Sequence, residues 1–74
     1  MPDMDLRGVP CPLNFVRTKL RLEKLSVGES LEVWLDAGEP VEQVPHSLEI
    51  AGHRICELEP QMEGHYRLVV ERGS

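Results

Sequence analysis

One cysteine, Cys11, stands between two prolines and directly before a segment with the apolar spacing of a helix. A thiol is a nucleophile only as the thiolate, and the N–H groups at a helix N-terminus stabilise that form. Pro12 suits the first helical position because its φ angle is fixed and its missing N–H is no loss there. The pattern predicts a thiol held at the helix mouth, able to attack a sulfane sulfur and hold it as a persulfide. The alternative is a small buried packing residue.

The remaining residues do not form a recognisable hydrolase, dithiol, metal or phosphate-binding motif. His46, His53 and His65 lie far from Cys11 along the chain, which disfavours a cysteine–histidine hydrolase. There is no Cys-x-x-Cys pair, zinc-ligand spacing or glycine-rich phosphate loop, so we expect no dithiol redox site, no metal and no cofactor. Cys56 lies within an expected strand, and we interpret it as a small core or half-buried residue.

Length and composition limit the kind of protein. The 74 residues fit one domain, 1–74, whose 41% apolar and 28% charged residues are typical of a globular protein too small to wall a large cavity. A net charge of −5 argues against direct nucleic-acid binding. The N-terminal segment lacks a signal peptide's apolar region, and no apolar run is long enough to span a membrane. We therefore expect a cytoplasmic protein whose two cysteines stay reduced.

The apolar periodicity predicts two helices and four strands. We expect helices over residues 12–26 and 39–51, and strands over 3–7, 30–36, 53–59 and 65–72. Pro45 lies inside the second helix, so we expect a kink or a restart there. The order β-α-β-α-β-β predicts an α/β (α+β) two-layer sandwich, in which two helices cover one face of a mixed four-stranded sheet.

The first helix carries two apolar stripes on nearly opposite sides, although a helix on a sheet can bury only one of them fully. One stripe is Phe15, Thr18, Leu22 and Leu25, and the other is Leu13, Val16 and Leu20. The second stripe is either partly covered by the other helix or the chain ends, or exposed for a partner or a dimer mate. Basic residues in the same segment form either a solvated face or a docking face for an acidic partner; they are Arg17, Lys19, Arg21 and Lys24.

Trp34 alternates with the apolar residues of its strand, so we expect it on the sheet face away from the helices. We interpret it as an aromatic brace among polar neighbours such as Arg67. A contact surface is the alternative, because tryptophan is common at the centres of interfaces.

The stretch "DLRGVPCPLNFVRTKL" resembles the signature of the TusA/SirA-like sulfur carriers, Asp-x-x-Gly-x-x-Cys-Pro-x-Pro. Asp5, Gly8, Cys11 and Pro12 match it, whereas Asn14 replaces the second proline. The resemblance implies a two-layer sandwich whose cysteine, here Cys11, accepts persulfide sulfur from a cysteine desulfurase or a rhodanese-like donor. It also implies relay by thiol–persulfide exchange to an acceptor protein, in tRNA thiolation, sulfur oxidation or cofactor assembly.

Asn14 falls in the first helical turn, where its amide can bond locally or back toward the backbone at the thiolate. Two rival functions stay open. One is a non-catalytic interaction module that docks through the first helix, by Leu13, Val16, Leu20 and Arg17. The other is thiosulfate or disulfide redox chemistry that pairs Cys11 with a partner's thiol.

Overall fold

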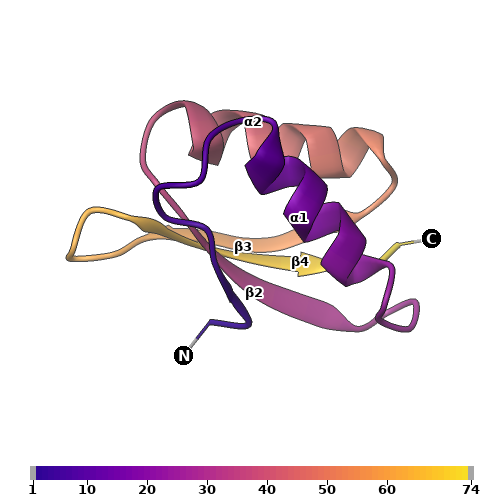
Figure 1. Cartoon of the computed structure of the whole chain (residues 1–74). Coiled ribbons are helices and arrows are strands. Elements are labelled where there is room, and N and C mark those ends of the chain that lie inside the picture. Colours follow the sequence, from indigo (N-terminus) through magenta and orange to yellow (C-terminus); the bar gives the residue numbers. More distant parts are fainter. Residues whose placement is uncertain (1, 74) are drawn as a thin grey trace.

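The elements follow one another in the predicted order β-α-β-α-β-β (Figure 1). The computed structural model describes residues 2–73. The elements in this range are β1 (Met4–Asp5), α1 (Leu13–Leu22), β2 (Ser30–Leu35), α2 (Glu39–Ile50), β3 (Arg54–Pro60) and β4 (Tyr66–Glu71). No helix in this range is both long and apolar enough to cross a membrane.

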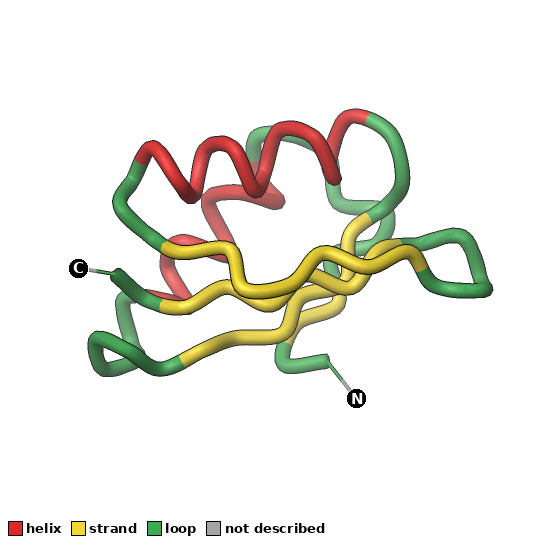
Figure 2. Tube along the Cα trace, turned by 180° about the vertical axis from the view of Figure 1, so that it is seen from behind, coloured by secondary structure: helices red, strands yellow, loops and turns green. Residues whose placement is uncertain are grey.

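The sheet has the strand order β1-β2-β4-β3, with β1 parallel to β2 and the other pairs antiparallel. Both helices lie on one face of this sheet, as Figures 1 and 2 show from opposite sides. The two-layer sandwich with a mixed sheet is therefore confirmed. Its parallel pair matters for the site, because the chain leaves β1 and β2 at the same end of the sheet.

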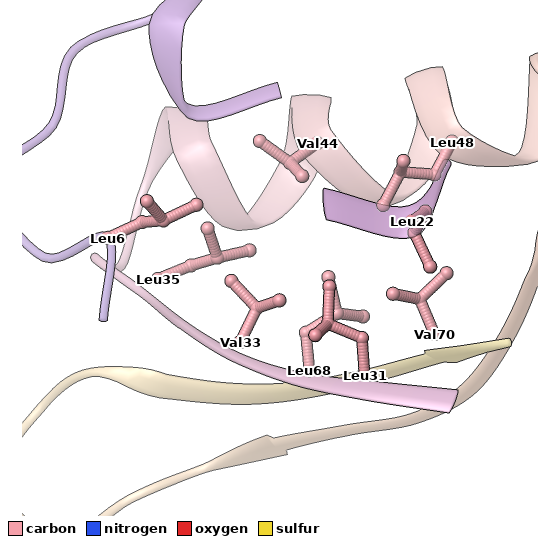
Figure 3. Close-up of a cluster of buried hydrophobic side chains, with 9 residues drawn as sticks. All are labelled: Leu6, Leu22, Leu31, Val33, Leu35, Val44, Leu48, Leu68 and Val70. Carbon is pink, nitrogen blue, oxygen red and sulfur yellow. The ribbon is translucent and has the colours of Figure 1, made fainter. Parts of the chain in front are cut away.

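The core lies between the two layers and follows the predicted alternation in β2 and β4. Side chains from the sheet point up toward the helices, and side chains from α1 and α2 point down onto them (Figure 3). The buried cluster consists of Leu6, Leu22, Leu31, Val33, Leu35, Val44, Leu48, Leu68 and Val70. Of the α1 stripes, Thr18 and Leu22 are buried, and Phe15 and Leu25 pack partly against the cluster.

The end of α1 differs from the sequence prediction: the helix stops at Leu22 rather than near residue 26. The guanidinium group of Arg72 donates hydrogen bonds to the carbonyl oxygens of Glu23 and Leu25. Both carbonyl oxygens belong to the turn that follows α1, which is thereby bonded to the far end of the chain. Because Arg72 is 47 or more residues away, the local pattern could not indicate it.

Of the kink or restart predicted at Pro45, the restart was wrong, because α2 is one continuous helix from Glu39 to Ile50. Pro45 itself is buried, as are Val44 and Leu48 of the same helix. A proline in a helix removes one hydrogen bond and costs about 3 kcal/mol. Burial of its ring in the core offsets part of this cost, so the helix continues through it.

The interpretation of Cys56 as a core or half-buried residue was also wrong, because the residue is exposed. The pairing of β3 with β4 shifts register between Ile55 and Glu57, so Cys56 lies at a bulge. A bulge leaves one residue out of the ladder and breaks the alternation of faces. In addition, β3 is an edge strand, which leaves one side uncovered.

Trp34 lies half-buried on the sheet face away from the helices, as predicted. Its Nε1–H donates to Glu32 Oε2 at 3.1 Å, and its register partner on β4 is Arg67. Arg67 in turn pairs with Glu32, Glu57 and Glu59. Trp34 therefore has the polar neighbours that the sequence predicts, Arg67 among them.

Candidate functional site

Cys11 lies in the turn that leads into α1, with its side chain exposed to solvent. Its exposure rules out the interpretation of Cys11 as a buried packing residue. Pro12 is the N-cap residue of α1, one position before the predicted one, and the Cys11–Pro12 peptide bond is cis. Cys11 therefore lies at the positive end of the helix dipole.

The first backbone N–H groups of α1 are only partly engaged. The N–H of Asn14 donates to Pro10 O at 3.1 Å, and the N–H of Phe15 donates to Asn14 Oδ1 at 2.7 Å. Within residues 2–73, no hydrogen bond is donated by the N–H of Leu13. The helix start thus keeps an unpaired donor close in the chain to Cys11, in the region where anions are favoured.

Asn14, which replaces the second motif proline, is fully buried on the core-facing side of α1. Its Oδ1 accepts the Phe15 N–H, and its backbone oxygen accepts the Thr18 hydroxyl at 2.8 Å. Its Nδ2 has no partner in the described part of the chain. The amide therefore bonds locally, as predicted, but not back toward the backbone at Cys11.

The loop from β1 to Cys11 is anchored to β2 at two points. The N–H of Leu6 donates to Trp34 O at 2.9 Å, and the N–H of Gly8 donates to Asp36 Oδ2 at 2.6 Å. Gly8 has a φ angle of 80°, which a residue with a side chain rarely adopts. Asp36 was missed in the sequence, although a parallel β1–β2 pairing would have placed it beside this loop.

Asp5, the first motif residue, binds Arg7 rather than Cys11. The Arg7 guanidinium donates to Asp5 Oδ1 at 2.9 Å and to Oδ2 at 2.7 Å. The side-chain hydrogen bonds from Arg7 are the main cause that lowers the pKa of Asp5 from 3.8 to about 2. Arg7 also lies over the ring of Trp34, with its Cζ 4.7 Å from the ring centroid. This pairing fixes the exit of β1, where the Cys11 loop begins.

Two of the three histidines contact other parts of the fold, whereas His46 is exposed on α2. His65 is buried, and its ring centroid lies 4.5 Å from that of Trp34. His53 accepts the Gly73 N–H on its Nδ1 at 3.2 Å. Among the hydrogen bonds of the described residues, none joins a histidine to Cys11. The same residues contain no cluster of three or more metal-ligating side chains and no surface pocket.

The second apolar stripe of α1 is only partly covered, and a large share of each residue remains exposed. Leu13, Val16 and Leu20 are 47%, 42% and 55% exposed. The basic residues of this segment are exposed beside them: Arg17, Lys19, Arg21 and Lys24. The stripe begins directly after the Cys11–Pro12 pair, so the thiol and the stripe share one continuous exposed segment.

Comparisons with known proteins show what the chain as a whole is similar to. A family model described as sulfurtransferase TusA matches residues 3–72. A "putative sulfur carrier protein" of Archaeoglobus fulgidus is 36% identical over 69 residues, which cover 93% of this chain and 78% of that protein. One of the same description from Thermotoga maritima is 32% identical over 68 residues, or 92% and 86% of the two chains. The crystal structure of a SirA-like protein from Desulfitobacterium hafniense shares the fold, with a TM-score of 0.82, 22% identity and 96% of each chain covered.

Proposed function

Because this chain belongs to the TusA sulfurtransferase family, whose role is to carry sulfur between proteins, we propose that Cys11 is the residue that holds the sulfur. The observation that carries the proposal is the exposed thiol at the N-terminus of α1. The partners would be a cysteine desulfurase or a rhodanese-like donor, and a downstream acceptor protein.

The transfer would take place in two exchanges of the same kind. The Cys11 thiolate attacks the outer sulfur of the donor's persulfide, and the donor's thiolate leaves as the Cys11 persulfide forms. The acceptor's thiolate then attacks the outer sulfur on Cys11, and the Cys11 thiolate leaves. The outer sulfur passes from thiol to thiol at constant oxidation state, so neither step needs an oxidant or a reductant.

The surroundings of Cys11 suit this chemistry. A negatively charged sulfur, either attacking or leaving, would face the positive end of α1. Gly8 and Asp36 hold the preceding loop, and Pro12 sets the direction of the chain at the helix start. Because Cys11 is exposed rather than enclosed, donor and acceptor proteins can reach it in turn.

An intact-mass experiment tests the proposal. The protein is incubated with a cysteine desulfurase and cysteine, and we expect the wild-type chain to gain the mass of one sulfur atom. Cys56→Ser provides the matched control, since both cysteines are free and exposed. Cys56→Ser should keep the gain and Cys11→Ser should lose it; equal gains in the two variants would contradict the role of Cys11.

A further inference from the structure

The outward side of α1 is an apolar stripe bordered by cations, and we call it the α1 outer face. Its apolar residues lie opposite the buried Asn14, Thr18 and Leu22, since successive helix residues turn by about 100°. The last of them, Leu20, is seven positions after the first, Leu13, so the stripe runs roughly 10 Å along the helix from the turn that holds Cys11. The face consists of Leu13, Val16, Arg17, Lys19, Leu20 and Arg21, together with Lys24 and one acid, Glu23, in the turn that follows the helix.

The charge on this face contrasts with that of the whole chain. The chain has a net charge of −5, yet the face holds four of its eight Lys and Arg residues. Elsewhere, Arg7 is paired with Asp5, and Arg67 is surrounded by glutamates. Among residues 2–73, no ion pair engages the four cations of the α1 outer face. Their charge is therefore available to a partner.

We propose that the α1 outer face docks a protein surface on which carboxylates border an apolar patch, and that this docking delivers the partner's sulfur to Cys11. The inference rests on the proposed function, because Cys11 must be the residue that exchanges sulfur. An apolar centre with complementary charges around it is the common anatomy of a specific interface. A footprint only two helical turns long suits a brief contact, which a carrier with successive partners requires.

Peptide disulfides test this recognition without a cognate partner. Each probe is a peptide with a cysteine between leucines, and this cysteine is activated as a mixed disulfide with nitrothiobenzoate. The residues outside the leucines are glutamates in the acidic probe and lysines in the basic probe. The Cys11 thiolate attacks the peptide sulfur, and the coloured nitrothiobenzoate thiolate leaves and is measured. The protein carries Cys56→Ser so that one thiol reacts. Methyl methanethiosulfonate, a small neutral reagent, reports the intrinsic reactivity of Cys11.

We expect the acidic probe to react about tenfold faster than the basic probe at low ionic strength, with the difference shrinking as salt is added. Arg17→Glu combined with Arg21→Glu should reverse the preference, and Leu20→Ser should slow both leucine-containing probes. The matched controls are Arg54→Glu on β3 and Ile50→Ser at the end of α2, which are exposed far along the chain from Cys11. Both should behave as the parent protein, and all variants should react equally with the neutral reagent.

Equal rates with the two probes, or equal losses in the control variants, would overturn the proposal. A dimer that is seen in sedimentation and abolished by Leu20→Ser would also overturn the proposal, because a second copy of the chain would then cover the α1 outer face. Binding to anionic lipid vesicles that is abolished by Leu20→Ser would also overturn the proposal, because the α1 outer face would then bind a membrane surface rather than a protein. The mass gain at Cys11 is measured separately. If docking fails but the mass gain is seen, the proposed function stands and only the docking proposal is wrong. If the mass gain is absent, the proposed role of Cys11 is wrong.

Discussion

The assignment of the two α1 stripes can be tested by comparing Leu22→Ala with Leu20→Ala. Leu22 is fully buried among the core residues drawn in Figure 3, whereas the side chain of Leu20 is 55% exposed. Both changes replace leucine with alanine within one helix, so their effects on helix propensity nearly cancel in the comparison. The difference in unfolding free energy then reports the burial of the two side chains.

The size of the effect follows from the burial. Removing a buried leucine side chain costs about 2–5 kcal/mol, and we expect about 3 kcal/mol for Leu22→Ala. A chain of this length has a total stability of about 4–11 kcal/mol, so this single change removes a large part of it. With a urea m-value of about 1 kcal/mol per molar, the unfolding midpoint should fall by about 3 M. Leu20→Ala should shift it by about 0.5 M or less.

Urea unfolding followed by tryptophan fluorescence provides the measurement. The chain's one tryptophan, Trp34, lies on the opposite face of the sheet from both substitutions, so its signal reports global unfolding. If Leu20→Ala destabilised the protein as much as Leu22→Ala, or more, the argument that the outer stripe is unpartnered in the monomer would be refuted.

Three further predictions concern the loop and the chain end. The pKa of Asp5 is lowered from 3.8 to about 2, chiefly by the hydrogen bonds from Arg7, so its stabilisation is present above pH 3.8 and lost as the pH falls through about 2. The difference in stability between wild type and Asp5→Asn should vanish over that range, and an NMR titration of the carboxyl should give the same value. Asp36→Ala removes the acceptor of the Gly8 N–H and should cost about 1 kcal/mol in urea unfolding and slow sulfur uptake, with Asp36→Asn retaining both. Gly73→Ala would place a Cβ 1.9 Å from the backbone carbonyl oxygen of Gly52, in the turn before β3. We therefore expect a lower melting temperature and a loss of about 1–3 kcal/mol in unfolding free energy, and an unchanged melting curve would contradict this prediction.

Much of the fold was predictable because its signals are local. The alternation of Leu31, Val33 and Leu35 indicated a strand with one buried face, and the structure buries all three. The turn after α1 was not predictable, because the carbonyl oxygens of Glu23 and Leu25 in it bond to Arg72 from the far end of the chain. Cys56 was misjudged for a related reason, since a bulge against β4 interrupts the alternation on which the prediction depended.

In the candidate site, too, some features follow from local sequence and others depend on tertiary contacts. Cys11, Pro12 and the following helix are consecutive in sequence, so local patterns were enough to place the thiol at a helix start. Asp36 could not be recognised, because its role depends on β2 lying parallel to β1 and bringing the two strand ends together. The contact of Asp5 with Arg7 was within reach of local reasoning, but the stacking of Arg7 over Trp34 depends on the sheet.

The sequence by itself determined the order of the elements, the faces of the central strands and the position of Cys11 at a helix start. These properties follow from side-chain periodicity and from proline and glycine geometry, which act over a few residues. Only the tertiary structure decided which α1 stripe is buried, because a helix with two apolar sides does not specify which one faces the sheet. It also decided that Asn14 turns into the core while Leu13, Val16 and Leu20 face solvent next to Cys11. That choice depends on the layer beneath the helix, which is assembled from strands distant in the chain.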